Sequence, residues 1–345
     1  MDVVVAGESD IGVVREENED SLAIHEPSDP EVRRTKGTLV LLADGMGGLE
    51  DGSAASRLAV ESVVRAYYER KEPPRAALEL AVKEANRAIF DHSQSTGSGK
   101  LMGSTITALA LLDGTACVAQ VGDSRAYCYR DGTLRQVTRD HSLVRELVDM
   151  GRIEEASPHY TFHRNVLTRG LGLREDVAVD LYELRDLDPG DQILLSTDGL
   201  HELVRPEEIT ACLVRFGPQV KAACKELVQL ARSRGGPDNI TVAIACVQGG
   251  PRPATAPPEA PATASRRASS PLWILPLLIF GSFTGGVLLT LGVQAPGIDP
   301  ESALRIRAEV RAALEHDEHA VPAAQRRAEL RESLQRIESI LDANK

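Results

Sequence analysis

The stretch TITALALLDGTACVAQV, residues 105–121, decides the fold class. Two apolar runs with strand-like composition, Thr105–Leu112 and Thr115–Val121, are joined only by Asp113-Gly114. An Asp-Gly pair between two such runs is typical of a β-hairpin. The stretch therefore predicts antiparallel strands and disfavours a doubly wound parallel sheet.

Strand-like and helical runs continue on both sides of this hairpin, over residues 1–248. Further strands are predicted at Met1–Gly7, Thr38–Ala43, Val177–Glu183, Gln192–Ser196 and Ile240–Cys246. Helices are predicted at Ala54–Glu69, Arg75–Ser93, Leu143–Met150 and Gln219–Ser233. We therefore expect an α+β domain at 1–248, with antiparallel sheets covered by helices.

Composition excludes several classes of protein. The net charge of −12 argues against nucleic-acid binding, because a phosphate backbone needs a basic face. The five cysteines are odd in number and none are spaced as CxxC, which disfavours a zinc or disulfide framework. Scattered cysteines in apolar runs are typical of core residues in a reducing compartment.

The C-terminal third has a different composition. Residues 249–271 form a linker rich in Pro, Ala and Ser, and residues 272–293 carry no charge. At about 1.5 Å per residue this run can cross a hydrocarbon core of about 30 Å, so we predict one transmembrane helix rather than a buried core helix. Arg266 and Arg267 precede it, which predicts a single-pass inner or plasma membrane protein with its N-terminal domain in the cytoplasm.

The segment after the span, residues 294–345, is predicted to be a short helical tail. Four apolar residues recur there at helical spacing: Leu330, Leu334, Ile337 and Leu341. Within the span, Gly281 and Gly285 form a small-xxx-small pair that would let two copies pack as a dimer.

Acidic residues beside Gly or Asn recur at the ends of apolar runs. The clusters are Asn18-Glu19-Asp20, Asp44-Gly45-Met46-Gly47-Gly48, Gly122-Asp123-Ser124, Ser196-Thr197-Asp198-Gly199 and Asp238-Asn239. A single Asp-Gly is usually a turn. Several carboxylates delivered by strand ends instead suggest an oxygen-rich site, which hard cations such as Mg²⁺ and Mn²⁺ prefer.

The order of these motifs resembles the metal-dependent serine/threonine protein phosphatases of type 2C, in their bacterial form. The matching motifs are R-x-x-N-E-D (15–20), L-x-D-G-M-G-G (42–48), M-G-S-T (102–105), V-G-D-S-R-x-Y (121–127), D-H-S (140–142), S-T-D-G-L (196–200) and D-N-I-T-V (238–242). The resemblance covers residues 1–248. It implies a central antiparallel β-sandwich flanked by helices in four layers, α-β-β-α.

The resemblance also implies a role for each matching residue. Asp44 would bridge two Mn²⁺ or Mg²⁺ ions, and the carbonyl of Gly45 would ligate one of them. Asp198 and Asp238 would complete the site of the other ion.

Three further positions complete the implied site. Glu19 and Asp20 would hold the water shell of the first ion. Asp123 would help to bind a third, looser ion.

Arg15 would grip the substrate phosphate, because a guanidinium fork matches phosphate oxygens. The implied reaction is hydrolysis of phosphoserine and phosphothreonine in proteins by a metal-activated water. The expected partners are phosphoproteins, namely Ser/Thr kinases or their substrates.

The sequence departs from parts of the family, and alternatives stay open. Met46 and Leu49 stand where other members carry His, which leaves the general acid unassigned. His141 is a candidate for that role, but a structural hydrogen bond is the expected one. A catalytically inactive phospho-binding scaffold is disfavoured because every implied metal-binding Asp is present, whereas a membrane-anchored dimerising component is compatible with an active enzyme.

Overall fold

The computed structural model describes residues 2–46, 52–95, 102–149 and 166–249. One compact unit spans Met1–Pro251 and a second spans Arg252–Lys345. The predicted membrane span at 272–293 and tail at 294–345 lie outside the described residues, as does the linker after Gly249. No helix within the described ranges is long and apolar enough to cross a membrane.

The described strands form two antiparallel sheets of five. One sheet has the order β1 (Val3–Asp10), β10 (Ile240–Val247), β9 (Gln192–Ser196), β6 (Arg125–Arg130) and β7 (Thr133–Gln136). The other has the order β2 (Asp20–His25), β3 (Thr38–Asp44), β4 (Ile106–Leu112), β5 (Thr115–Val121) and β8 (Asp180–Leu184). The predicted hairpin is β4–β5, and its turn residues Asp113 and Gly114 have φ values of 43° and 78°. Such left-handed values at both positions are those of the tight hairpin turn that Asp-Gly favours.

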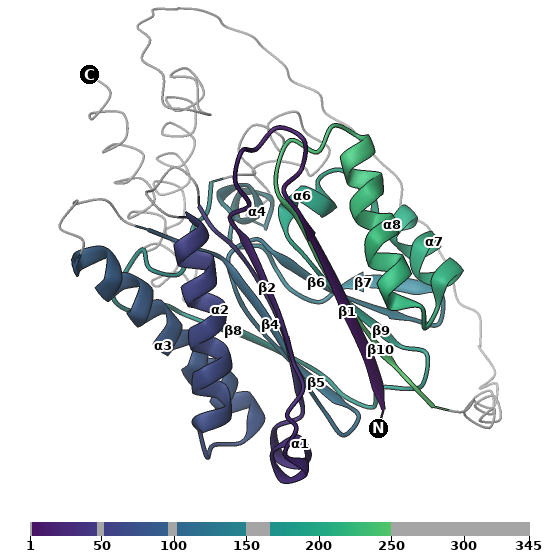
Figure 1. Cartoon of the computed structure of the whole chain (residues 1–345), viewed down its shortest axis with the longest axis horizontal. Helices are drawn as coiled ribbons and strands as arrows, with labels where there is room; N and C mark the ends of the chain where they lie inside the picture. Colours follow the sequence, from purple (N-terminus) through teal and green to yellow (C-terminus); the bar gives the residue numbers. More distant parts are fainter. Residues whose placement is uncertain (1, 47–51, 96–101, 150–165, 250–345) are drawn as a thin grey trace, which may run out of the picture. The chain divides into compact units, whose positions relative to one another are not determined.

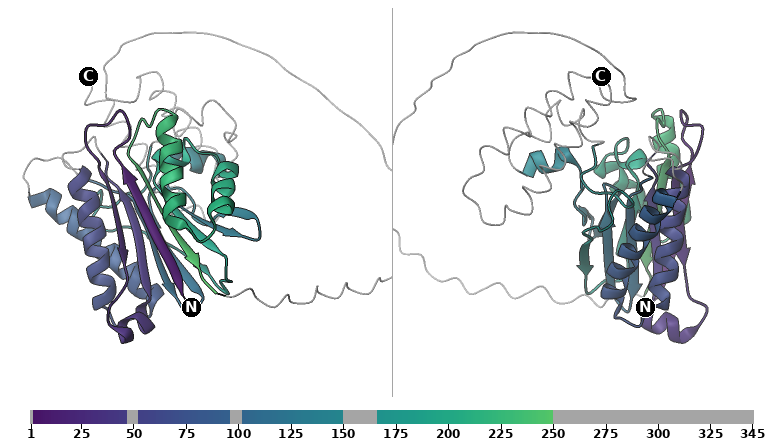
Figure 2. Two further views of the ribbon diagram at one scale, coloured as in Figure 1. Left: turned by 45° about the vertical axis from the view of Figure 1, so that its right-hand side comes forward. Right: turned by 90° about the vertical axis from the view of Figure 1, so that its left-hand side faces the viewer.

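Helices cover the outer face of each sheet (Figures 1 and 2). The sheet of β2–β3–β4–β5–β8 packs against α2 (Gly52–Glu69) and α3 (Pro74–Ser95). The sheet of β1–β10–β9–β6–β7 packs against α6 (Asp198–His201), α7 (Pro206–Phe216) and α8 (Val220–Ser233). The short helices α1 (Pro30–Lys36) and α4 (Leu143–Asp149) lie in connections between strands.

The two sheets face each other across a third apolar core. Leu42, Leu109 and Val118 of one sheet belong to the same buried cluster as Leu195 and Ala243 of the other. Because side chains alternate along a strand, each sheet buries one set of residues here and the other set under its helices. The predicted fold of two antiparallel sheets flanked by helices is confirmed.

Candidate metal centre

Five aspartates lie at strand ends that meet at one end of the sandwich. Asp20 begins β2 and is paired in register with Asp44, the last residue of β3. Asp123 follows β5, Asp198 follows β9, and Asp238 precedes β10. Burial raises the pKa of Asp44, and the charges of the other four raise it further, so the five carboxyl groups form one electrostatic cluster.

Asp20 is the most enclosed of these carboxylates. The Thr197 hydroxyl donates to its Oδ2 at 2.9 Å, whereas its buried Oδ1 has no hydrogen-bond partner. Burial raises the pKa of Asp20 to about 7, with further contributions from the charges of Asp198 and Asp238. A buried acceptor without a partner needs an explanation, and a bound cation supplies one.

Hydrogen bonds hold the backbone of Asp44. Its amide donates to the Thr105 hydroxyl at 2.9 Å, and its carbonyl accepts from Ser104 Oγ at 2.9 Å and from the Thr105 amide at 2.8 Å. The side chain is half-buried, and surrounding protein atoms together with neighbouring carboxylates raise its pKa well above the usual range. Asp44 is therefore a fixed carboxylate in a site where negative charge is disfavoured until a cation binds.

The Thr105 hydroxyl continues this network toward Asp123. It lies 2.8 Å from Ser124 Oγ, and both residues are fully buried. Burial raises the pKa of Asp123, and the charges of Asp198 and Asp140 raise it further. Two neighbouring hydroxyl groups thus connect the Asp44 strand end with the Asp123 loop.

Close backbone approach at the site requires glycine. A Cβ at Gly45 would lie 2.1 Å from the Gly52 carbonyl oxygen, and one at Gly52 would lie 2.4 Å from Glu19 Oε1. The Gly45 amide donates to the Glu19 carbonyl at 3.1 Å. These contacts bring Glu19 against the start of α2, beside the Gly45 carbonyl predicted to ligate a metal ion.

Asn239 fastens the N-terminal loop to the strand end that carries Asp238. Its Oδ1 accepts from the Glu19 amide at 2.8 Å, and its Nδ2 donates to the carbonyls of Ile11 and Glu17 at 3.0 and 2.9 Å. Residues far apart in sequence are thereby brought to one site.

Arg15 lies at the rim of the cluster. Its Nη2 donates to Asp238 Oδ2 at 2.8 Å, and its Nη1 is 3.7 Å from Glu19 Oε2. The side chain is 43% exposed, so the guanidinium is within reach of a ligand arriving from solution.

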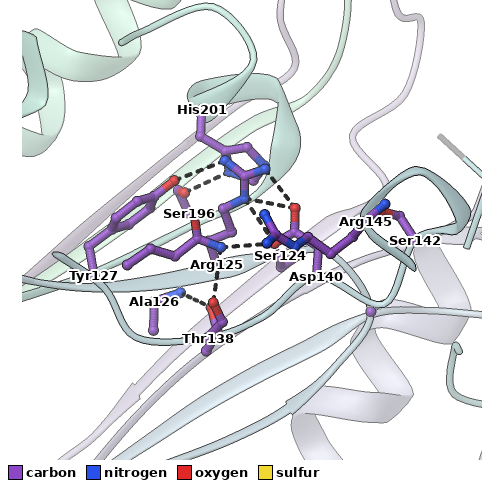
Figure 3. Close-up of polar contacts among 12 residues, drawn as sticks. Ser124, Arg125, Ala126, Tyr127, Thr138, Asp140, Ser142, Arg145, Ser196 and His201 are labelled. Atoms are coloured by element: carbon purple, nitrogen blue, oxygen red, sulfur yellow. Dashed lines mark hydrogen bonds and ion pairs between the residues drawn. The ribbon is translucent and has the colours of Figure 1, made fainter. Parts of the chain in front are cut away.

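Two conspicuous side chains near Asp123 have structural contacts. Arg125 forms a bidentate pair with Asp140, with Nε–Oδ1 at 2.9 Å and Nη2–Oδ2 at 2.6 Å (Figure 3). His141 is buried; its Nδ1 accepts from the Gly122 amide at 3.0 Å and its Nε2 lies 3.1 Å from Asp180 Oδ2. Burial lowers the pKa of His141, which favours the neutral ring. These contacts support a structural hydrogen-bonding role for His141, as expected from the sequence, over the role of general acid.

The donor set fits hard divalent cations. It consists of carboxylates and backbone carbonyls, which Mg²⁺ and Mn²⁺ prefer. No group of three or more His, Cys, Asp or Glu in the described part of the chain is arranged to hold a metal ion by itself. Ions that keep several waters do not need such a group, and the unpartnered Asp20 Oδ1 marks where positive charge is missing.

All eight predicted site positions lie in or beside this cluster: Arg15, Glu19, Asp20, Asp44, Gly45, Asp123, Asp198 and Asp238. No site role was predicted from the sequence for Thr105, Ser124, Thr197 or Asn239. Each stands inside one of the motifs quoted above. For Ser124, Thr197 and Asn239, the available signal is a hydroxyl or amide next to a strand-end Asp, whereas Thr105 has no neighbouring Asp in the sequence.

Comparisons with known proteins agree on one family. The protein phosphatase 2C family profile matches residues 16–235. A putative protein phosphatase 2C-type of Streptococcus pyogenes is 38% identical over 245 residues, covering 68% of this chain and 94% of that protein. The serine/threonine protein phosphatase PstP of Mycobacterium tuberculosis is 36% identical over 245 residues, covering 70% of this chain but 44% of its own length.

Solved structures give the same result. The M. tuberculosis phosphatase PstP/Ppp matches with a TM-score of 0.62 at 34% identity, over 72% of this chain and 99% of that one. The PstP catalytic domain in complex with two manganese ions matches with a TM-score of 0.60 at 34% identity, over the same shares of the two chains.

Proposed function

The chain belongs to the protein phosphatase 2C family, and from this premise we propose that its carboxylate cluster hydrolyses phosphoserine and phosphothreonine in phosphoproteins. Its relatives are named serine/threonine phosphatases, and one similar catalytic domain was solved with two manganese ions. The chain is accordingly a metal-dependent protein serine/threonine phosphatase that uses Mn²⁺ or Mg²⁺.

One observation carries the proposal for these particular residues. Asp20 and Asp44 are paired in register at strand ends, the pKa of each is raised, and Asp20 Oδ1 is buried without a partner. Carboxylates placed side by side with so little solvent are stable as anions only when a cation neutralises them.

The residues of the cluster would have different roles in binding the ions. Asp44, the Gly45 carbonyl, Asp198 and Asp238 would hold two ions, with Glu19 and Asp20 oriented toward the waters of one and Asp123 toward a third, looser ion. Bound divalent ions supply positive charge to the phosphate oxygens and lower the pKa of water, so that it is a nucleophile at neutral pH.

Arg15 is placed to receive the phosphate. A bidentate guanidinium matches two phosphate oxygens, and a dianionic substrate would compete with Asp238 and Glu19 for this side chain. Thr197 holds the carboxylate of Asp20, and Thr105 holds the backbone of Asp44, so neither strand end has to move when substrate arrives.

We also propose that the enzyme is anchored in the inner or plasma membrane, with the catalytic unit in the cytoplasm, and opposes a Ser/Thr kinase there. The uncharged run at 272–293 and the preceding Arg266 and Arg267 support this. A tether raises the effective concentration toward membrane-bound phosphoproteins. Deleting 272–293 should move the protein from the membrane fraction to the soluble fraction; an unchanged distribution would contradict the anchor.

The catalytic proposal is tested with a phosphothreonine peptide and the full chain. We expect turnover that disappears with a chelator and returns with Mn²⁺. Asp44→Asn should reduce it by about 10²–10³-fold, the scale of losing one charge-stabilising group. Undiminished metal-dependent turnover by that variant would refute the assignment of the site.

A further inference from the structure

Exposed apolar side chains gather on the loop between β1 and β2. Seven large hydrophobic residues are exposed in the described part of the chain, and three of them are Ile11, Val13 and Val14. Val13 is 59% exposed and Val14 is 68% exposed. Single exposed hydrophobic residues are ordinary, but a group at the rim of an active site marks a surface for a ligand.

Backbone contacts hold this loop in place. Gly12 has a φ of 82°, its amide donates to Asp10 Oδ1 at 2.8 Å, and a Cβ there would lie 2.2 Å from the Asp238 carbonyl oxygen. The Val13 amide donates to the Gly236 carbonyl at 2.8 Å. The exposure of the two valines is therefore fixed by attachment to the segment that carries Asp238.

The valines adjoin Arg15, which is proposed above to receive the substrate phosphate. Arg15 follows Val14 directly and donates to Asp238 Oδ2 at 2.8 Å. In Figure 1 the loop between β1 and β2 rises at the end of the sandwich where α6 begins, which is the end that carries Asp198. A peptide whose phosphate lies at Arg15 therefore places the side chain next to its phosphorylated residue near Val13 and Val14.

We propose that Val13 and Val14 form an apolar platform for the side chain that flanks the phosphorylated residue of the substrate. This rests on the proposed phosphatase function and adds a substrate class: phosphopeptides with a branched apolar residue next to phosphoserine or phosphothreonine. Contact of that side chain with the valines removes apolar surface from water on both partners.

Other occupants fit this surface less well. Exposed Glu16 and Glu17 follow Arg15, so an anionic lipid surface would meet repulsion there. A second copy of the chain would need about 800 Å² from each partner, far more than two valine side chains offer.

The test compares two phosphothreonine peptides of equal length and charge, with either Val or Thr on both sides of the phosphothreonine. Val13→Thr combined with Val14→Thr keeps the side-chain shape and adds hydroxyl groups. With the full chain and Mn²⁺, this variant should lose about tenfold in kcat/KM on the valine peptide, chiefly through KM. Turnover of p-nitrophenyl phosphate, which has no flanking residue, should be unchanged.

Val214→Thr is the matched control, because Val214 on α7 is 60% exposed and distant in sequence from the loop. It should affect neither peptide. Equal losses on both peptides, or no loss, would overturn the platform. The platform would also be overturned if the double variant changed only the binding of anionic vesicles or the self-association of the chain.

Failure of the phosphatase proposal would give a different result from failure of the platform proposal. If the wild-type chain hydrolysed neither peptide with any divalent ion, the phosphatase assignment would fall. Fluorescence anisotropy with the same labelled phosphopeptides would still decide the platform, since binding of the valine peptide must then weaken about tenfold in the double variant.

Discussion

Asp20, the first residue of β2, stands directly opposite Asp44, the last residue of β3. Like charges at directly opposed positions of an antiparallel pair destabilise a sheet, because their Cβ atoms lie only about 4.5–5.5 Å apart. Repulsion between the two carboxylates therefore destabilises the metal-free protein. A bound cation relieves this repulsion, which increases the affinity of the site for the cation.

The metal-free protein should lose stability as the pH rises. Burial raises the pKa of Asp20 from 3.8 to about 7, and Asp44 and Asp123 shift in the same direction. Between those values the native state binds more protons than the unfolded state, so the free energy of unfolding falls with increasing pH. Thermal unfolding in chelator should give a lower Tm at pH 7.5 than at pH 5.5.

Two comparisons make this result specific. Saturating Mn²⁺ should raise the Tm most at pH 7.5, because it binds the ionised carboxylates of the native state. Asp20→Asn should flatten the pH dependence in chelator. A metal-free Tm that increases from pH 5.5 to 7.5 would contradict the assigned pKa shifts.

Thr105 should couple stability to metal binding. Thr105→Val keeps the side-chain shape but leaves the Asp44 amide and Ser124 Oγ without their hydroxyl partner. Unsatisfied buried groups cost about 1–3 kcal/mol, measurable by urea unfolding. Because the Asp44 amide is no longer held, Mn²⁺ affinity measured by calorimetry should fall about tenfold, the low end for loss of an outer-shell partner.

Thr105→Ser is the matched control, since it retains the hydroxyl and removes only a methyl group. It should keep wild-type Mn²⁺ affinity even if it loses some stability. Equal loss of Mn²⁺ affinity in both variants would show that packing, and not the hydroxyl, positions Asp44.

The two ring nitrogens of His141 should be separable by substitution. Asparagine at this position retains an acceptor near Nδ1 for the Gly122 amide, whereas glutamine retains a donor near Nε2 for Asp180. Gly122 precedes Asp123, so His141→Gln should raise the Mn²⁺ concentration for half-maximal activity about tenfold. His141→Asn should raise it much less, and equal effects of the two variants would refute a role through Gly122.

The strands buried on both faces were predictable from the sequence. β5 and β9 have the predicted bounds, and β4 begins one residue later than predicted. Their continuous apolar runs reflect burial between a helical layer and the opposite sheet. The Asp113-Gly114 turn fixed the pairing of β4 with β5.

Three strands, β2, β6 and β7, were not predicted, whereas the edge strands β1 and β8 were predicted with shifted bounds. β2 is an edge strand that is mostly half-exposed, and β7 is an edge strand with mainly exposed residues. β6 begins and ends with Arg. The apolar runs of β2 and β6 are short, Leu22–Ile24 and Ala126–Tyr129, and β7 has none, although Asp131-Gly132 between β6 and β7 is the same turn signal as in the predicted hairpin.

The residues of the site also fall into a group that was predicted from the sequence and a group that was not. Carboxylates beside Gly or Asn were recognisable as candidate ligands because their chemistry is local. The groups that hold them were not, because the contact of Asn239 with Glu19, or of Thr197 with Asp20, joins residues separated by most of the catalytic unit. Such contacts depend on how the two sheets are stacked, which no local pattern specifies.

The direction of β10 has a mechanical consequence for whatever follows it in the chain. Asp238 precedes this strand, and its eight residues at about 3.3 Å each carry the chain about 26 Å away from the carboxylates before Gly249. β10 is hydrogen-bonded to β1 on one side and β9 on the other. A pull on Gly249 along the axis of β10 would therefore load both ladders in shear, so that many hydrogen bonds share the force before it reaches Asp238.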